Sequence, residues 1–399
     1  MQRIGLITFL IFLFMLELAN VYFIMPFPGS QQQNSIALAY WLNKNMDWLR
    51  TLLLVSSILL VAQLLKNANR KTRIKLILPF VLYAIIFFMV KFQMKADTMF
   101  YQPSNLVMAT IGKNKVPGEN LVIGVTINGE AKAYPIQFIG YHHQVRDSIG
   151  QMPVMITYCT VCRTGRVYSP VIDGQVQKFR LVGMDHFNAM FEDETTKSWW
   201  RQVNGEAVAG TLKGKKLLEI PSQQMLLSDW LLSYPNSQVM QADTLFKSEY
   251  ADMEKFDKGL SKGDLTRRDS LSWKEKSWVI GISMGEYARA YDWNDLIQHS
   301  IINDSFGTTP VVILVEKDSS SFHGWSRRIA GRSLNFNIAD SAELIVDQQT
   351  NSSWNMSGWC IDGELKGNQL TRIPTYQEFW HSWRTFHPNT TRYQANISQ

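Results

Sequence analysis

Three long apolar runs near the N-terminus constrain this chain more than any other feature. The first, Ile4 to Met25, is interrupted only by Glu17, and two more lie at about Leu49 to Leu65 and Ile74 to Val90. Runs of this length can span a bilayer, and three joined by short polar loops are typical of membrane helices rather than buried core helices. Residues 1–95 are therefore predicted to be a three-helix transmembrane region.

Basic residues predict how these helices are oriented. The loop between the second and third runs reads KNANRKTRIK and contains five Lys or Arg residues. The positive-inside rule assigns such a loop to the cytoplasm, so the chain after residue 95 is predicted to lie outside the cytoplasm, which is the periplasm if the cell is Gram-negative. A cleaved signal peptide at residues 1–25 would leave the same topology. We predict a multi-pass protein of the cell membrane whose C-terminal domain is extracytoplasmic.

The chain has a net charge of +6, and its excess of positive charge lies in the predicted membrane region. Residues 1–95 contain ten Lys or Arg and two Asp or Glu, a net charge of +8, which leaves −2 for the remainder. A near-neutral outer domain has no electrostatic footprint for nucleic acid, so no nucleic-acid partner is predicted. The membrane is the one partner that the sequence predicts, and it identifies no protein or redox partner.

The outer region resembles itself in two places, which indicates an internal duplication. The segment VIGVTINGEAKAYPI from Val122 aligns with VIGISMGEYARAYDW from Val279, and GTLKGKKLLEIP aligns with GELKGNQLTRIP further along. We interpret residues 96–241 and 277–399 as two similar lobes packed as one unit. The charged segment 242–276 is interpreted as the linker between them.

Within each copy the pattern is mostly β. Val122 to Ile127 and Val154 to Tyr158 are β-branched runs typical of strands, and an Asp-Gly pair after Tyr168 predicts a hairpin. Short helices are predicted at Pro135 to Tyr141 and Gln223 to Leu232. The predicted fold class is an α-helical membrane anchor of three transmembrane helices plus a mainly-β (α+β) extracytoplasmic domain.

A Cys-x-x-Cys pair, Cys159 and Cys162, is the strongest chemical signal in the chain. It follows a predicted strand in ITYCTVCRTG, and the second copy has VEKDS at the same place. Chemistry present in one copy only marks a candidate site. The remaining cysteine, Cys360, lies in an apolar stretch and is predicted to be buried.

No helix is predicted to begin at Cys159, which weakens a thioredoxin-like interpretation and favours a metal knuckle. Two thiolates need further ligands, and His142 is the best third candidate, with Met190 as a softer alternative. A set of Cys, Cys, His and Met would select Cu(I), whereas Cys, Cys, His and His would suit zinc. The other histidines and acids considered as ligands are His143, Asp185 and His186.

A family resemblance accompanies these motifs. TYCTVC, followed by DETTKSWWRQ and NGEAVAG, resembles the DUF3179 family, a domain of unknown function, over residues of about 105 to 392. The resemblance implies that Cys159, Cys162 and His142 are family features. Thr160 stands where the family has Pro within the clamp, and Arg146 where it has Asn.

Three functions remain open. The leading hypothesis is a membrane-anchored metal-binding protein, with copper handling or electron transfer favoured over structural zinc. The second is a thiol–disulfide oxidoreductase that uses the same pair, for which Arg163 or Arg166 would supply a nearby positive charge. The third is a non-catalytic interaction or scaffold domain. Whether the chain is an enzyme is not decided by its sequence.

Overall fold

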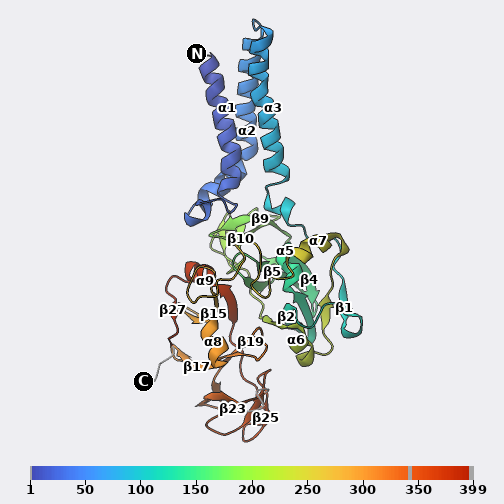
Figure 1. Ribbon diagram of the computed structural model, residues 1–399, viewed down its shortest axis with the longest axis vertical. Helices are drawn as coiled ribbons and strands as arrows, with labels where there is room; N and C mark the ends of the chain where they lie inside the picture. The colour runs from blue at the N-terminus through green and yellow to red at the C-terminus, as the bar shows by residue number, and fades with distance from the viewer. Residues whose placement is uncertain (1, 340–343, 395–399) are drawn as a thin grey trace. The chain divides into compact units, whose positions relative to one another are not determined.

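The computed structural model describes residues 2–339 and 344–394. By contacts it divides into two compact units, which are described separately. The first unit comprises Met1–Tyr101 and Gln177–Lys216, and the second comprises Gln102–Val176 and Leu217–Gln399 (Figure 1). The domain boundaries expected from the sequence repeat remain a prediction.

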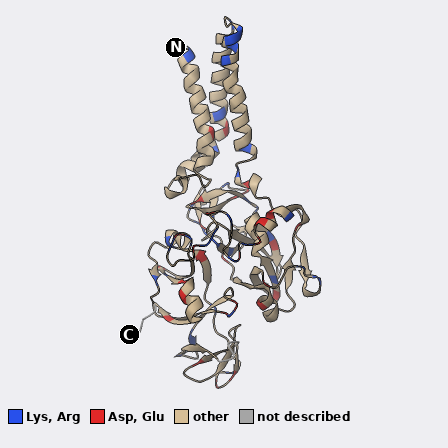
Figure 2. Cartoon of the chain, viewed as in Figure 1, with Lys and Arg blue, Asp and Glu red and all other residues tan. Residues whose placement is uncertain are grey.

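The three predicted membrane helices are present in the first unit. They are α1 (Gln2–Tyr22), α2 (Ile36–Leu65) and α3 (Arg70–Phe92), and all three are long and apolar enough to cross a membrane. The helix α2 begins well before the apolar run that predicted it, because its first turns pack on other parts of the unit, where Ala39 is buried. Charged side chains gather at the connection between α2 and α3 and are sparse along the helices (Figure 2).

One charged cluster holds the three helices together. The fully buried Glu17 of α1 accepts hydrogen bonds from Arg50 of α2, at 2.7 and 3.1 Å, and from the Tyr83 hydroxyl of α3, at 2.7 Å. An acid in an apolar helix is costly unless it is paired, and this one is paired with both neighbouring helices. Glu17 is therefore a packing element of the bundle.

The rest of the first unit is a small antiparallel sheet in the order β12-β11-β10-β9. Trp199 and Met190 of this sheet pack on residues that follow α1 and on the first turns of α2, among them Ile24 and Ala39. The strands are β9 (Phe179–Asp185), β10 (Asn188–Asp193), β11 (Trp199–Arg201) and β12 (Ala207–Ala209); the short elements η1 (Ser30–Gln32) and α4 (Ala96–Met99) complete the unit.

The second unit begins with what we call the first lobe, which has two sheets. One has the strand order β1-β14-β3-β2-β13 and the other β4-β5-β6. Their strands are β1 (Met108–Thr110), β2 (Leu121–Ile127), β3 (Glu130–Pro135), β4 (Gln144–Ile149), β5 (Met152–Cys159), β6 (Thr164–Tyr168), β13 (Gln223–Leu226) and β14 (Gln238–Met240). The helices are α5 (Ile136–His142) and α6 (Leu227–Ser233), with η2 (Ile111–Lys113) and the hairpin β7 (Val171–Ile172) and β8 (Gln175–Val176).

The second lobe of this unit follows the same order of strands and helices but has a third sheet, whose counterpart in that order, β9 to β12, lies in the first unit. Its sheets are β26-β15-β16-β27, β17-β18-β19 and β22-β23-β24-β25. The strands are β15 (Trp278–Met284), β16 (Tyr287–Asp292), β17 (Ile301–Phe306), β18 (Thr309–Val315), β19 (Phe322–Ser326), β22 (Phe336–Ile338), β23 (Leu344–Asp347), β24 (Ser353–Asn355), β25 (Cys360–Asp362), β26 (Thr375–Phe379) and β27 (Thr391–Arg392); a hairpin is formed by β20 (Arg328–Ile329) and β21 (Arg332–Ser333). The helices are α8 (Trp293–His299) and α9 (Trp380–Phe386).

A glycine–tryptophan contact recurs in both lobes. A Cβ built on Gly124 of β2 would stand 2.2 Å from the Trp230 ring of α6, and a Cβ on Gly281 of β15 would stand 2.2 Å from the Trp383 ring of α9. Each indole thus lies directly on a strand, where only glycine leaves room for it. The contact fixes α6 and α9 against their sheets.

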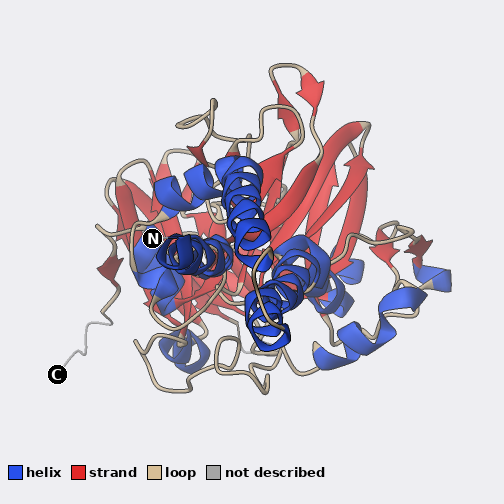
Figure 3. Cartoon of the chain, turned by 90° about the horizontal axis from the view of Figure 1, so that it is seen from above, coloured by secondary structure: helices blue, strands red, loops and turns tan. Residues whose placement is uncertain are grey.

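Most of the predicted elements are confirmed, and one needs correction. The mainly-β character of the chain after α3 is evident in Figure 3. The Asp173-Gly174 turn has positive φ at both residues, as the hairpin requires. The helix predicted at Gln223 to Leu232 is wrong at its start: residues 223–226 are strand β13, because they pair with β2 at the sheet edge. The segment expected to be a linker contains η3 (Thr244–Phe246) and α7 (Lys247–Asp252).

Candidate functional site

The Cys-x-x-Cys pair lies in a tight turn between two strands of the second unit. Cys159 is the last residue of β5 and pairs with Thr164, the first residue of β6. The turn requires a left-handed backbone at Arg163, whose φ is 55°. Both cysteines are fully buried and not joined as a disulfide. The predicted strand–turn–strand setting is therefore confirmed, and no helix begins at the first cysteine.

A histidine from the second lobe contacts the cysteine turn. The Cys162 thiol is hydrogen-bonded to Cys159 and to His381, which lies in the first turn of α9. The backbone continues this contact, because the N–H of Phe379 donates to the Cys162 carbonyl at 2.9 Å. Two cysteines and a histidine, all buried, thus meet where the lobes join.

The ring of His381 has a defined tautomer. Its Nδ1 lies 3.1 Å from the Glu275 carbonyl oxygen, which can only accept, so Nδ1 carries the proton. Nε2 then has the lone pair, which can accept a thiol proton or bind a metal. Histidines that bind metals commonly donate their other nitrogen to a carbonyl in this way.

The electrostatics of the site keep the thiol protonated. Burial raises the pKa of the Cys162 thiol well above 9.0, and the neighbouring Cys159 raises it further, while His381 lowers it. Without a cation, Cys162 is therefore a neutral, weakly reactive thiol at neutral pH.

Lys276 supplies a positive charge beside the two sulfurs. Its Nζ donates to the carbonyl of Val161, inside the cysteine turn, at 2.8 Å, and lies 4.6 Å from the Phe379 ring centre. Burial lowers the pKa of Lys276 to about 8, and the two cysteines oppose that effect. The ammonium is therefore placed to compensate negative charge on the thiolates.

The two arginines after the clamp join the lobes. Arg163 donates to Gln377 at 2.9 Å, and its Cζ lies over the Trp278 ring, 3.7 Å from the ring centre. Arg166 forms a buried ion pair with Glu378 at 2.7 Å. Each is thus engaged with the second lobe, and the cation that acts on the thiols is Lys276.

The histidines predicted near the clamp have other partners. His142 Nε2 lies 2.6 Å from the Tyr250 hydroxyl, in an aromatic cluster with Tyr141 and Phe246. His143 is the residue that ends α5, and burial lowers its pKa to about 4, so it is neutral at pH 7.

The remaining predicted ligands lie in the first unit. Met190 packs in the core of the small sheet beside Trp199. The Asp185 carboxylate binds His186 at 2.7 Å and Arg201 at 2.5 Å. Within residues 2–339 and 344–394, no group of three or more His, Cys, Asp or Glu side chains is arranged to hold a metal ion.

Sequence reasoning missed His381 and Lys276. A signal for the histidine was present: with Trp230 aligned on Trp383, His381 falls opposite Ser228. The histidine is thus found in one copy only, which is the criterion that singled out the cysteines. Nothing in the local sequence marks Lys276, because its role depends on how the lobes pack.

Comparison with known proteins bears on the family alone. No curated protein and no solved structure matches the chain. The family described as "Protein of unknown function (DUF3179)" matches residues 104–390. This range is most of the chain and includes Cys159, Cys162 and His381. The resemblance carried by TYCTVC and its neighbouring motifs is thereby confirmed: the chain belongs to the DUF3179 family.

Proposed function

We propose that this chain is a membrane-anchored protein that holds a Cu(I) ion between the thiolates of Cys159 and Cys162, on the extracytoplasmic side of the membrane. One observation carries the proposal: two buried cysteine sulfurs in direct contact, with His381 hydrogen-bonded to one of them. Thiolates are soft ligands that select Cu(I).

The number of ligands favours copper over zinc. Structural zinc takes four protein ligands and catalytic zinc takes three. In the described part of the chain two thiols and His381 come together here, but no group of three such side chains is arranged to hold a metal ion. Cu(I) accepts two thiolates alone, and His381 is adjacent as a third donor or as a hydrogen-bond partner.

The charge of the site favours the same ion. Two thiolates and Cu(I) have a net charge of −1, which the ammonium of Lys276 neutralises. Two thiolates and Zn²⁺ are already neutral, and the partly buried ammonium would then have only the neighbouring Glu275 as a counter-charge. The site therefore suits a monovalent soft cation.

The distribution of basic residues favours a location of this site on the outer side of the membrane. The basic residues between α2 and α3, Lys66 to Lys75, favour a cytoplasmic connection, so that three spans leave the second unit outside. In an oxidising compartment, cysteines are usually found as disulfides, and a bound soft metal keeps a free pair reduced.

The lobes are best explained by duplication of one ancestral unit. The first lobe together with β9 to β12 of the first unit has the same succession of strands and helices as the second lobe. Both lobes also place a tryptophan on a glycine, Trp230 on Gly124 and Trp383 on Gly281. In this view the first copy kept the cysteines and the second contributed His381.

The test is a Cu(I) competition titration on the full chain in detergent, under reducing conditions, with a chromogenic Cu(I) chelator. One equivalent of Cu(I) is expected to be retained by the wild type and lost in Cys159→Ser and Cys162→Ser. Cys360→Ser is the matched control, because Cys360 is also a buried free thiol but lies in the core of the second lobe. Equal retention by all four proteins would overturn the proposal.

A thiol–disulfide oxidoreductase is the second candidate. The direct contact of the two sulfurs and the nearby ammonium of Lys276 favour it. It predicts no copper retention and a pair that is reversibly oxidised, with loss of two maleimide-reactive thiols in the unfolded protein after oxidation.

A further inference from the structure

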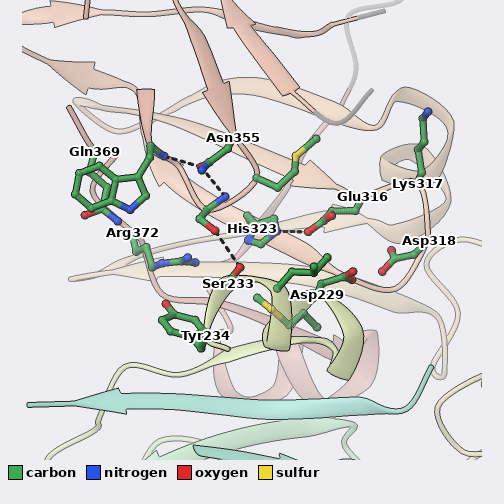
Figure 4. A pocket seen from close by; sticks show the side chains of 15 residues that line it. Asp229, Ser233, Tyr234, Glu316, Lys317, Asp318, His323, Asn355, Gln369 and Arg372 are labelled. Atoms are coloured by element: carbon green, nitrogen blue, oxygen red, sulfur yellow. Dashed lines mark hydrogen bonds and ion pairs between the residues drawn. The ribbon is translucent and has the colours of Figure 1, made fainter. Parts of the chain in front are cut away.

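A cavity of about 710 Å³ lies in the second unit, away from the cysteine turn, and has no role in the proposed copper site. It is formed by α6, by the turn between β18 and β19, and by the segment that follows β24 (Figure 4). Its volume fits a small molecule.

One end of this cavity is acidic. Asp229 of α6 faces Glu316 and Asp318 of the β18–β19 turn, on which Lys317 also lies. Asp229 and Asp318 both contact the hydroxyl of Ser321, which accepts a hydrogen bond from the Leu226 N–H and has a single proton to donate. Asp318 also accepts from the backbone N–H groups of Ser320 and Ser321, but the two carboxylates share the one hydroxyl proton that lies between them. A cation between them would therefore be stabilised.

The other end has a guanidinium. Arg372 lies beside Tyr234, whose hydroxyl it hydrogen-bonds, on the side of the cavity opposite to Asp318 (Figure 4). Among the residues that the structure describes, Arg372 forms no ion pair with a carboxylate. A half-buried guanidinium of this kind presents a planar fork that matches a carboxylate.

The wall between the two ends has an unused nitrogen and an apolar surface. His323 is 4% exposed, and its Nε2 lies 2.6 Å from the Glu316 carboxylate. Its Nδ1 has no hydrogen-bond partner within the described part of the chain. Met225 and the half-exposed Trp359 add apolar surface to the lining.

We propose that this cavity binds a small zwitterion, an amino acid or a compound of that kind, with its carboxylate on Arg372 and its ammonium between Asp229, Glu316 and Asp318. The separation of charge along the cavity selects a ligand with an anion at one end and a cation at the other. A ligand with one charged group would satisfy one end only and would bind more weakly.

Isothermal titration of the full chain in detergent at pH 7.5 tests this. The probes are glycine, 4-aminobutanoate, 6-aminohexanoate and 8-aminooctanoate, which vary the distance between the charges, and hexanoate and hexylamine, which have one charge each. At least one of the amino acids is expected to bind about tenfold more tightly than either hexanoate or hexylamine. If no amino acid exceeds both of them, the proposal is overturned.

Variants locate the binding site. Arg372→Gln is expected to reduce the affinity for the best amino acid to that of hexylamine, and Asp229→Asn to lower it toward that of hexanoate. Arg328→Gln is the matched control, since Arg328 is exposed and outside the cavity lining. Unchanged affinity in Asp229→Asn would overturn the proposal even if Arg372→Gln fails to fold. Copper retention does not enter this experiment, so its outcome is independent of the proposed function.

Discussion

Cys162, in the turn after β5, and His381, in α9, are hydrogen-bonded to each other although they come from different lobes. The corresponding turn of the second lobe, after β18, is contacted by a helix of the first lobe. Ser321, which ends the turn after β18, hydrogen-bonds Asp229 of α6 at 2.7 Å. Each lobe therefore places its short helix on the β-turn of the other, and the two contacts have different chemistry.

Replacing His381 is expected to weaken Cu(I) binding. His381→Ala removes a ligand or hydrogen-bond partner of the sulfurs, and we expect an affinity loss of roughly 10–100-fold. The competition titration measures it. His387→Ala is the control, because His387 stacks on Trp383, with ring centres 3.8 Å apart, and follows the same helix. Wild-type affinity in His381→Ala would remove this histidine from the site.

Because of Lys276, the stability of the folded chain is expected to rise at alkaline pH. Its pKa of about 8 in the folded chain lies below its ordinary value of 10.5, so folding disfavours the ammonium. This penalty is fully present below pH 8 and is relieved as the pH rises toward 10.5. The difference in melting temperature between the wild type and Lys276→Met should therefore shift in favour of the wild type between pH 8 and 10. A constant difference would contradict this.

Asp229 predicts the opposite trend in acid. Burial raises its pKa to about 6, and the neighbouring acids Asp318 and Glu316 add to the effect. Because the folded chain holds this proton more tightly than the unfolded chain, whose value is near 3.8, stability falls as the pH rises from about 4 to about 6. Asp229→Asn should lose that part of the pH dependence in melting curves at pH 4.5 and 7. The same slope in both proteins would refute the assignment.

The buried ion pair of the helical bundle predicts a strong single-variant effect. Arg50→Leu leaves the Glu17 carboxylate without its cation, and we expect a loss of roughly 3–5 kcal/mol in the free energy of unfolding. The double variant Glu17→Leu/Arg50→Leu removes both charges and should recover most of that loss. Unfolding in mixed micelles with increasing dodecyl sulfate measures both. A double variant no more stable than the single one would show that the pair itself does not set the stability.

A side chain at Gly124 is expected to lower the stability of the first lobe, because it would displace Trp230. The Cβ of Gly124→Ala would meet the Trp230 ring at 2.2 Å, so the indole must move, at a cost of about 1–3 kcal/mol. Gly112→Ala is the control in the same lobe, because its Cβ would meet nothing within 4 Å. Denaturant unfolding should separate the two variants, and equal stability would mean that α6 adjusts freely.

The sequence predicted most of the framework, because patterning and turn chemistry act locally. The apolar runs predicted α1 and α3 closely, and the strand before Cys159 was predicted because its β-branched residues are bounded by turn residues. Strand β13 was mistaken for helix since its partner, β2, is distant in the sequence, and pairing decides between the two conformations.

The candidate site was predictable only in part. Cys159 and Cys162 are marked by their spacing, whereas their neighbours are set by the packing of the lobes. His142 is near the cysteines in sequence and yet binds Tyr250, which follows β14 in the chain. His381 is far from them in sequence and binds Cys162. Proximity along the chain therefore did not identify the histidine that contacts the cysteines.

Because the cysteine turn is covered by a helix from the other lobe, the site around Cys159 and Cys162 can form only late in the synthesis of the chain. The cysteine turn emerges early, but His381 and the Phe379 N–H that bind it belong to the segment through α9, which is made long afterwards. Until that segment has been made and has docked, both thiols are open to oxidants and to metal ions. The growing chain therefore needs its cysteines protected for most of its synthesis, and a chain arrested before α9 would carry an exposed pair.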